Sequence, residues 1–151
     1  MSEAFDLSNN NPLLSLYARN ASILVFKMFG VAALTGKIRH SKKKFANIED
    51  AKAIKGAQVD TADEDVERVR RAHLNDLENI PPFLCISFLY ILTDPEPKLA
   101  RNLFLGFTAA RICHTLVYAV KPVRQPARGL CYGVGLAITC YMATKVIKHF
   151  W

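Results

Sequence analysis

The last third of the sequence contains no acidic residue. All 13 Asp and Glu residues of the 151-residue chain lie at or before Glu96, whereas eight Lys and Arg residues follow it. A soluble surface usually mixes charges of both signs. Positive charge alone around long apolar stretches is more typical of a membrane protein that binds something anionic. A disordered chain is excluded, because hydrophobic residues make up 51% of the sequence.

Several common functional motifs are also missing. No GxxxxGK run predicts a phosphate-binding loop, and no Ser is placed beside a His and an acid to form a hydrolase triad. The four His lack the spacing and the Cys partners of a metal site, so none is expected. The four Cys form no CxxC pair and are expected to be small core residues rather than catalytic thiols. Basic patches that flank apolar spans give no support to nucleic-acid binding.

Four apolar stretches predict an all-α integral membrane protein, a four-helix bundle that forms one domain over residues 1–151. A spanning helix needs about 20 mainly apolar residues. Three stretches reach this length, and the second in chain order reaches it only if its helix begins upstream among charged residues. A soluble four-helix bundle is the alternative, but residues 83–92 and 130–144 are apolar on all sides. The expected spans are about 13–38, 66–92, 99–120 and 128–147.

The distribution of basic residues predicts how the spans are oriented. The side that holds the first and third loops carries ten Lys and Arg residues, against four on the opposite side. Cytoplasmic loops carry the excess of positive charge. The long loop at about 39–62 is therefore expected in the cytosol, and both termini are expected on the lumenal side.

Three of the expected helices carry a polar stripe towards their cytosolic half. A helix advances about 100° per residue, so residues three and four apart share a face. Taken singly, each stripe has a simpler explanation, such as arginines that reach the headgroups, a core histidine or an interfacial tyrosine. Together the stripes can meet in one pocket. Their members are Arg71, Asn75 and Glu78; Arg111, His114, Thr115 and Tyr118; and Arg128, Tyr132 and Gly135.

Charged residues at membrane depth need partners, because lipid cannot solvate them. Lys27, Asp76, Glu78 and Arg111 sum to zero charge and are predicted to form ion pairs between helices. Asp63 is expected to cap the N-terminus of the second long helix. A pocket that offers Arg, Glu, Asn and Tyr side chains suits a small anionic ligand that also carries an amine.

Several motifs in order give the chain a family resemblance. Residues 67–83 read ERVRRAHLNDLENIPPF, and they are accompanied by KKFANIED at 43–50, ARICHTLVYAV at 110–120 and QPARGL at 125–130. These segments resemble the membrane-associated proteins in eicosanoid and glutathione metabolism, the MAPEG family. The likeness is nearest to the microsomal glutathione transferases, with the prostaglandin E synthases as near kin.

The resemblance implies a homotrimer of four-helix subunits in the endoplasmic reticulum membrane, with the outer mitochondrial membrane as a second location. Glutathione would lie between neighbouring subunits on the cytosolic side. By position, Arg128 matches the arginine that holds the glutathione thiolate, and Asp50 matches an aspartate with a catalytic role in the synthases. The remaining positions that match glutathione-contacting residues are Arg39, Arg71, Asn75, Glu78, His114, Tyr118 and Tyr132.

Three departures bear on the activity. The synthases carry an arginine at the position of Leu74 and a serine at the position of Gly129, and both differences favour a transferase. Ala51 replaces the reactive loop cysteine of the transferases, so activation by thiol modification is expected to be absent. The implied activity is conjugation of glutathione to hydrophobic electrophiles, together with reduction of lipid hydroperoxides. A glutathione-dependent prostaglandin E synthase and a non-catalytic lipid-binding scaffold are the alternatives.

Overall fold

Four long helices make up most of the computed structural model, which describes residues 10–151. The first nine residues of the expected domain lie outside this range. Pro12 and Pro97 stand at the first position of their helices, where the missing N–H has no intrahelical partner to lose. The helices are α1 (Pro12–Lys42), α3 (Glu64–Ile91), α4 (Pro97–Thr115), which continues as the π-helix η1 (Leu116–Val120), and α5 (Ala127–Phe150).

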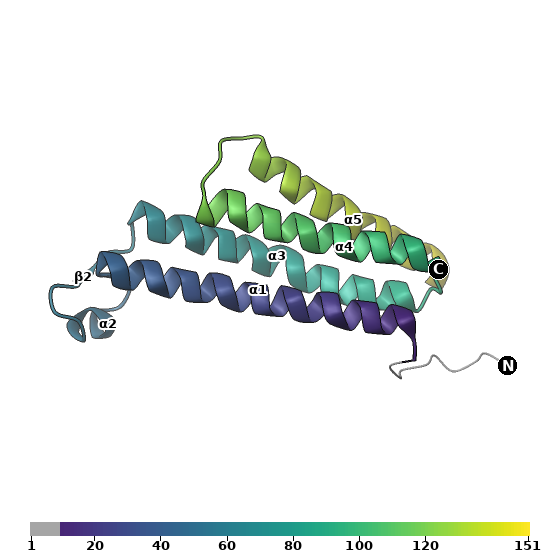
Figure 1. Cartoon of the computed structure of the whole chain (residues 1–151), viewed down its shortest axis with the longest axis horizontal. Coiled ribbons are helices and arrows are strands. Elements are labelled where there is room, and N and C mark those ends of the chain that lie inside the picture. Colours follow the sequence, from purple (N-terminus) through teal and green to yellow (C-terminus); the bar gives the residue numbers. More distant parts are fainter. Residues whose placement is uncertain (1–9) are drawn as a thin grey trace.

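The long helices form a closed four-membered bundle (Figure 1). Helix α1 packs on α3 and α4, and α5 packs on the same two helices from the other side. Inside, Phe83 of α3 stacks on Phe107 of α4, with ring centroids 3.6 Å apart. Gly135 of α5 lies against Phe107, where a Cβ would meet the ring at 3.4 Å, and this lets α5 approach α4 closely. The chain is therefore mostly helical, as the sequence predicts.

The segment between α1 and α3 contains more structure than the expected loop. It holds the short helix α2 (Ile48–Lys52) between strands β1 (Lys44–Phe45) and β2 (Gln58–Val59), which pair in parallel. Helix α1 also runs on to Lys42, and it ends because Lys43 adopts a left-handed conformation with φ 54°. The segment projects from one end of the bundle (Figure 1).

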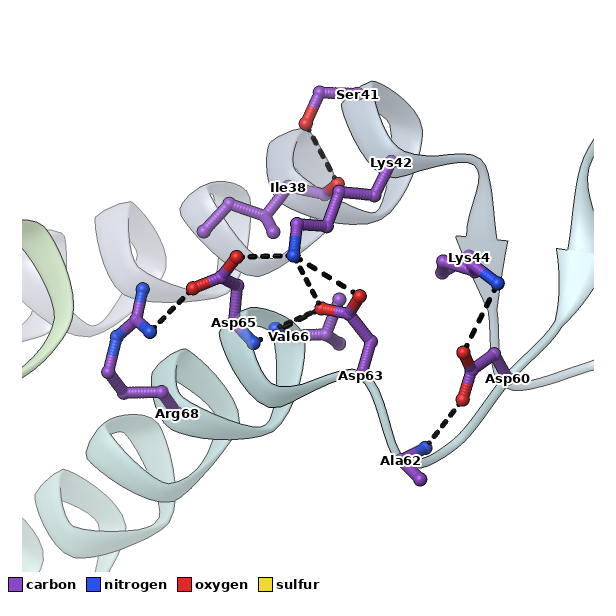
Figure 2. A network of polar contacts seen from close by, with 10 residues as sticks. All are labelled: Ile38, Ser41, Lys42, Lys44, Asp60, Ala62, Asp63, Asp65, Val66 and Arg68. Atoms are coloured by element: carbon purple, nitrogen blue, oxygen red, sulfur yellow. Dashed lines mark hydrogen bonds and ion pairs between the residues drawn. The ribbon is translucent and has the colours of Figure 1, made fainter.

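An ionic network joins the end of α1 to the start of α3 (Figure 2). The carboxylate of Asp63 accepts the backbone N–H groups of Asp65 and Val66, which confirms the expected cap. Lys42 Nζ donates to Asp63 Oδ1 at 3.1 Å and also pairs with Asp65, whose other oxygen accepts from Arg68 at 2.6 Å. The backbone N–H of Val66 holds the pKa of Asp63 below its usual range, and the bond from Lys42 does the same for the pKa of Asp65.

The outer faces of the bundle are strongly apolar. Phe26 is 75% exposed and Leu130 64% exposed, which water would not favour. Within residues 10–151, three helices are long and apolar enough to cross a membrane: α1, α4 with η1, and α5. The expectation that the cysteines are core residues is wrong, because Cys85, Cys113 and Cys140 are exposed. Cysteine is small and apolar enough to face lipid as readily as a protein core.

Candidate functional site

A pocket opens where α3, α4, η1 and α5 converge. Its volume is about 340 Å³, which lies within the usual range for small-ligand pockets, about 300–1,000 Å³. Polar side chains from all of these elements reach it. The lining residues are Asn75, His114, Tyr118, Gln125, Arg128, Gly129 and Tyr132.

Arg128 provides the positive charge of this pocket. It lies in the first turn of α5, and its guanidinium carbon is 4.6 Å from the centroid of the Tyr118 ring. Such an approach to an aromatic face holds a cation in place. The Nε atom of Arg128 is buried and has no hydrogen-bond partner among residues 10–151. A water or an acceptor from a ligand can satisfy such a donor, and an anionic group fits the pocket at this point.

A buried ionic cluster lies directly behind the pocket. Asp76 of α3 accepts from Arg111 Nη2 at 2.5 Å and from Arg111 Nε at 3.2 Å, and it also pairs with Lys27 of α1. The side chains of Asp76 and Arg111 are fully buried. The prediction of ion pairs between helices is thus confirmed for Lys27, Asp76 and Arg111.

The same prediction is wrong for Glu78, which is exposed and forms no salt bridge within the described chain. Asp76 and Glu78 are two residues apart, so they point about 200° away from each other on the helix. Only Asp76 faces Lys27 and Arg111. The cluster therefore contains two cations and one anion rather than balanced charges.

The cluster determines which atoms Asn75 can offer to a ligand, and it also lies beside His114. Arg111 Nη2 donates to Asn75 Oδ1 at 2.9 Å, which leaves the Asn75 NH₂ group for the pocket. Arg111 Nη2 also lies 3.4 Å from His114 Nδ1. The two hydrogens of Nη2 are accepted at shorter distances by Asp76 and Asn75, so the contact with His114 places the ring beside the guanidinium and is not a third full hydrogen bond. Asn75 thereby presents a hydrogen-bond donor to the pocket, which suits a carboxylate or a thiolate group.

The structure brings together five of the nine expected site residues. The other four lie apart from this pocket within one chain. Arg39 and Asp50 line a separate pocket of about 320 Å³ beneath α2, and Arg71 lines a third cavity beside Glu67. The Nε atom of Arg39 is buried and also has no partner among the described residues.

Two residues of the pocket were missed at the level of sequence. Gln125 Oε1 accepts a hydrogen bond from the backbone N–H of Gly129 at 3.2 Å, which satisfies one of the free N–H groups in the first turn of α5. Both residues belong to the QPARGL segment, but only its arginine was assigned a role. The signal that could have identified Gln125 is its position four residues before Gly129, which is typical of a side chain that satisfies a free N–H at a helix start.

These features define a helical membrane-protein bundle with a basic, donor-rich pocket near one end. The profile of the MAPEG family matches residues 18–148, so the chain belongs to this family. It is 43% identical to microsomal glutathione S-transferase 1 of Rattus norvegicus over 143 residues, which cover 92% of each chain. It is 41% identical to prostaglandin E synthase of Bos taurus over 138 residues, which cover 91% of this chain and 90% of the relative.

Proposed function

We propose that this protein is a membrane-bound glutathione transferase that conjugates glutathione to hydrophobic electrophiles and also reduces lipid hydroperoxides. The observation that carries the proposal is the guanidinium of Arg128, which lies over Tyr118 with a buried, unpartnered Nε in a pocket of donors. Family membership and the named transferase relatives support the same activity.

The residues of the pocket account for the main requirements of this chemistry. A free thiol has a pKa of about 8.5 and is mostly protonated at neutral pH. Arg128 would lower that pKa, because a cation beside the sulfur favours the thiolate. The Asn75 amide N–H would donate to a carboxylate of the ligand, and the His114 imidazole lines the same pocket. When bound, glutathione supplies the thiolate that forms a sulfur–carbon bond as the leaving group departs from the electrophile.

A homotrimer with glutathione between neighbouring subunits would explain the four site residues that lie outside the pocket. In such an assembly Arg39, Asp50, Arg71 and Glu78 would contact the ligand from an adjacent copy or after subunits pack. Arg39 has a buried donor without a partner, as expected of a residue that awaits a ligand. We place α3 as the fourth span, the α2 segment in the cytosol and the trimer in the endoplasmic reticulum membrane, with the outer mitochondrial membrane as a second location.

The decisive experiment is a glutathione titration of the detergent-purified protein, followed by the thiolate absorbance. We expect a saturable thiolate signal and conjugation of a chlorinated nitrobenzene. Arg128→Leu should abolish both while the oligomer survives, and Arg124→Leu should change neither, because Arg124 does not line the pocket. A full thiolate signal in Arg128→Leu would remove Arg128 from this role.

Prostaglandin E synthase activity is a second candidate, because synthases are as similar in identity as the transferases. Leu74 and Gly129, at positions where the synthases carry arginine and serine, favour the transferase. Assays with both substrates distinguish the two activities. A synthase converts the prostaglandin endoperoxide, whereas a transferase conjugates glutathione to the chlorinated nitrobenzene. Failure to bind millimolar glutathione would instead favour a lipid-binding scaffold.

A further inference from the structure

A second groove lies between α1 and α4 at the end of the bundle where both helices begin, opposite the α2 segment (Figure 1). Its volume is about 540 Å³, and it shares no lining residue with the pocket of Arg128. The wall is mainly apolar, built from Leu13, Leu16 and Ile23 of α1 and Leu105 of α4. From Leu13 to Ile23 it extends about 15 Å along the helix axis.

Two arginines border this α1–α4 groove, one from each helix. Arg19 and Arg101 are exposed, and neither forms a salt bridge within residues 10–151. Helical side chains tilt towards the N-terminus of their helix, and Arg19 Nε donates to the Ser15 carbonyl one turn earlier at 3.2 Å. The charged group of Arg19 is therefore directed towards the end of the bundle, and Arg101 lies near the start of α4 at the same end.

We propose that the α1–α4 groove binds an anionic phospholipid of the surrounding bilayer. The acyl chain lies along the leucine and isoleucine wall, and the phosphate is held between Arg19 and Arg101. A small soluble anion would contact the two arginines but not the apolar wall, whereas a phospholipid contacts both. In phosphatidylcholine the choline cation cancels the charge of the phosphate, so charge complementarity with two arginines favours a headgroup with net negative charge. Given the proposed orientation, this site faces the lumenal leaflet.

The test compares two lipids with identical acyl chains on the full-length, detergent-purified protein. Native mass spectrometry is used to measure the retention of phosphatidylserine and of phosphatidylcholine. We expect phosphatidylserine to bind at least about tenfold more tightly, and Arg19→Gln or Arg101→Gln to weaken it about tenfold, as loss of one charge-assisted contact implies. Lys98→Gln is the matched control, because Lys98 is an exposed cation at the same end of α4 that does not line the groove.

Four results would overturn the proposal. Equal retention of the two lipids would mean that the arginines do not select charge. An equal effect of Lys98→Gln would mean that bulk attraction, not a site, holds the lipid. A photo-crosslinking residue at position 23 should capture lipid, and capture of a second copy of the chain would instead make the groove a subunit interface. Glycerophosphoserine, which lacks acyl chains, should compete poorly; strong competition would also contradict a lipid site.

The lipid site and the proposed catalytic pocket can fail separately. Arg19→Gln is expected to leave the glutathione-dependent thiolate signal unchanged, because Arg19 does not line the pocket of Arg128. A parallel loss of both would show that Arg19 acts on the fold as a whole, and the lipid proposal would be withdrawn.

Discussion

Two charged networks lie along the same pair of helices, α1 and α3, and they differ in almost every physical respect. Lys27 and Asp76 are nearly or fully buried, with 9% and 0% of their side chains exposed, whereas Lys42 and Asp65 are 37% and 39% exposed. The two lysines are about 22 Å apart along α1. The same pair of residue types, a lysine and an aspartate, is therefore shielded from water at Lys27–Asp76 and solvated at Lys42–Asp65.

The difference lies in what happens when a partner is removed. Exposed ion pairs contribute little, because water and salt solvate either ion well. A buried ion left without its partner has no such replacement, so its loss is strongly destabilising. The Lys27–Asp76–Arg111 cluster should thus control whether the bundle forms, and the network of Figure 2 should control only how the α2 segment is attached.

The largest effect is expected from Asp76→Leu. This change leaves Lys27 and Arg111 buried beside each other without an anion, and it should lower the free energy of unfolding by about 3–5 kcal/mol. Thermal unfolding in detergent measures the loss, together with the fraction that elutes as folded oligomer. The same substitution at Asp65 is the control, and equal losses at the two sites would contradict the comparison.

Arg111→Lys should act next, and mainly on ligand binding. An ammonium group cannot contact Asp76 and Asn75 with the planar geometry of the guanidinium, so Asn75 loses the contact that orients its NH₂ group. We expect the Kd for glutathione to rise about tenfold, or about 1.4 kcal/mol, in a protein that remains folded. Arg70→Lys serves as the control, since Arg70 pairs with Glu67 on the surface. An unchanged Kd would show that the buried cluster does not orient the pocket.

Lys27→Met should have a smaller effect on stability. Asp76 keeps both of its bonds to Arg111, and the cluster becomes neutral. The expected loss of unfolding free energy is about 1 kcal/mol, measured in the same thermal assay. A loss as large as that of Asp76→Leu would mean that Lys27, rather than Arg111, neutralises the buried carboxylate.

The smallest effect is expected from acid on the exposed network. Folding lowers the pKa of Asp60, Asp63 and Asp65, so their contribution to stability is present above the usual carboxyl pKa of about 4. It is lost as the pH falls through the lowered values. Below about pH 4 the 43–62 segment should become more susceptible to pepsin while the bundle persists, and Lys42→Ala should remove much of this transition. Simultaneous loss of the helices would contradict it.

The sequence predicted the helices well, because long apolar runs leave few alternatives to a helix. Helical periodicity also grouped residues that do line one pocket, such as His114 with Tyr118 and Arg128 with Tyr132. It did not reveal which of Asp76 and Glu78 faces inward, because a charge pattern gives the angle between two side chains but not the direction of the bundle axis. The cysteines were misplaced for a related reason: apolar residues favour a core and a lipid-facing surface alike.

By itself, then, the sequence determined the length and polarity of the helices, the imbalance of charge and the family, since these follow from local composition and order. The tertiary packing of α3 against α1 and α4 decided that Asp76 pairs with both cations and that Arg111 holds the amide oxygen of Asn75. Those contacts join residues 35 to 49 positions apart. Only the three-dimensional arrangement of the helices brings such residues within hydrogen-bond distance.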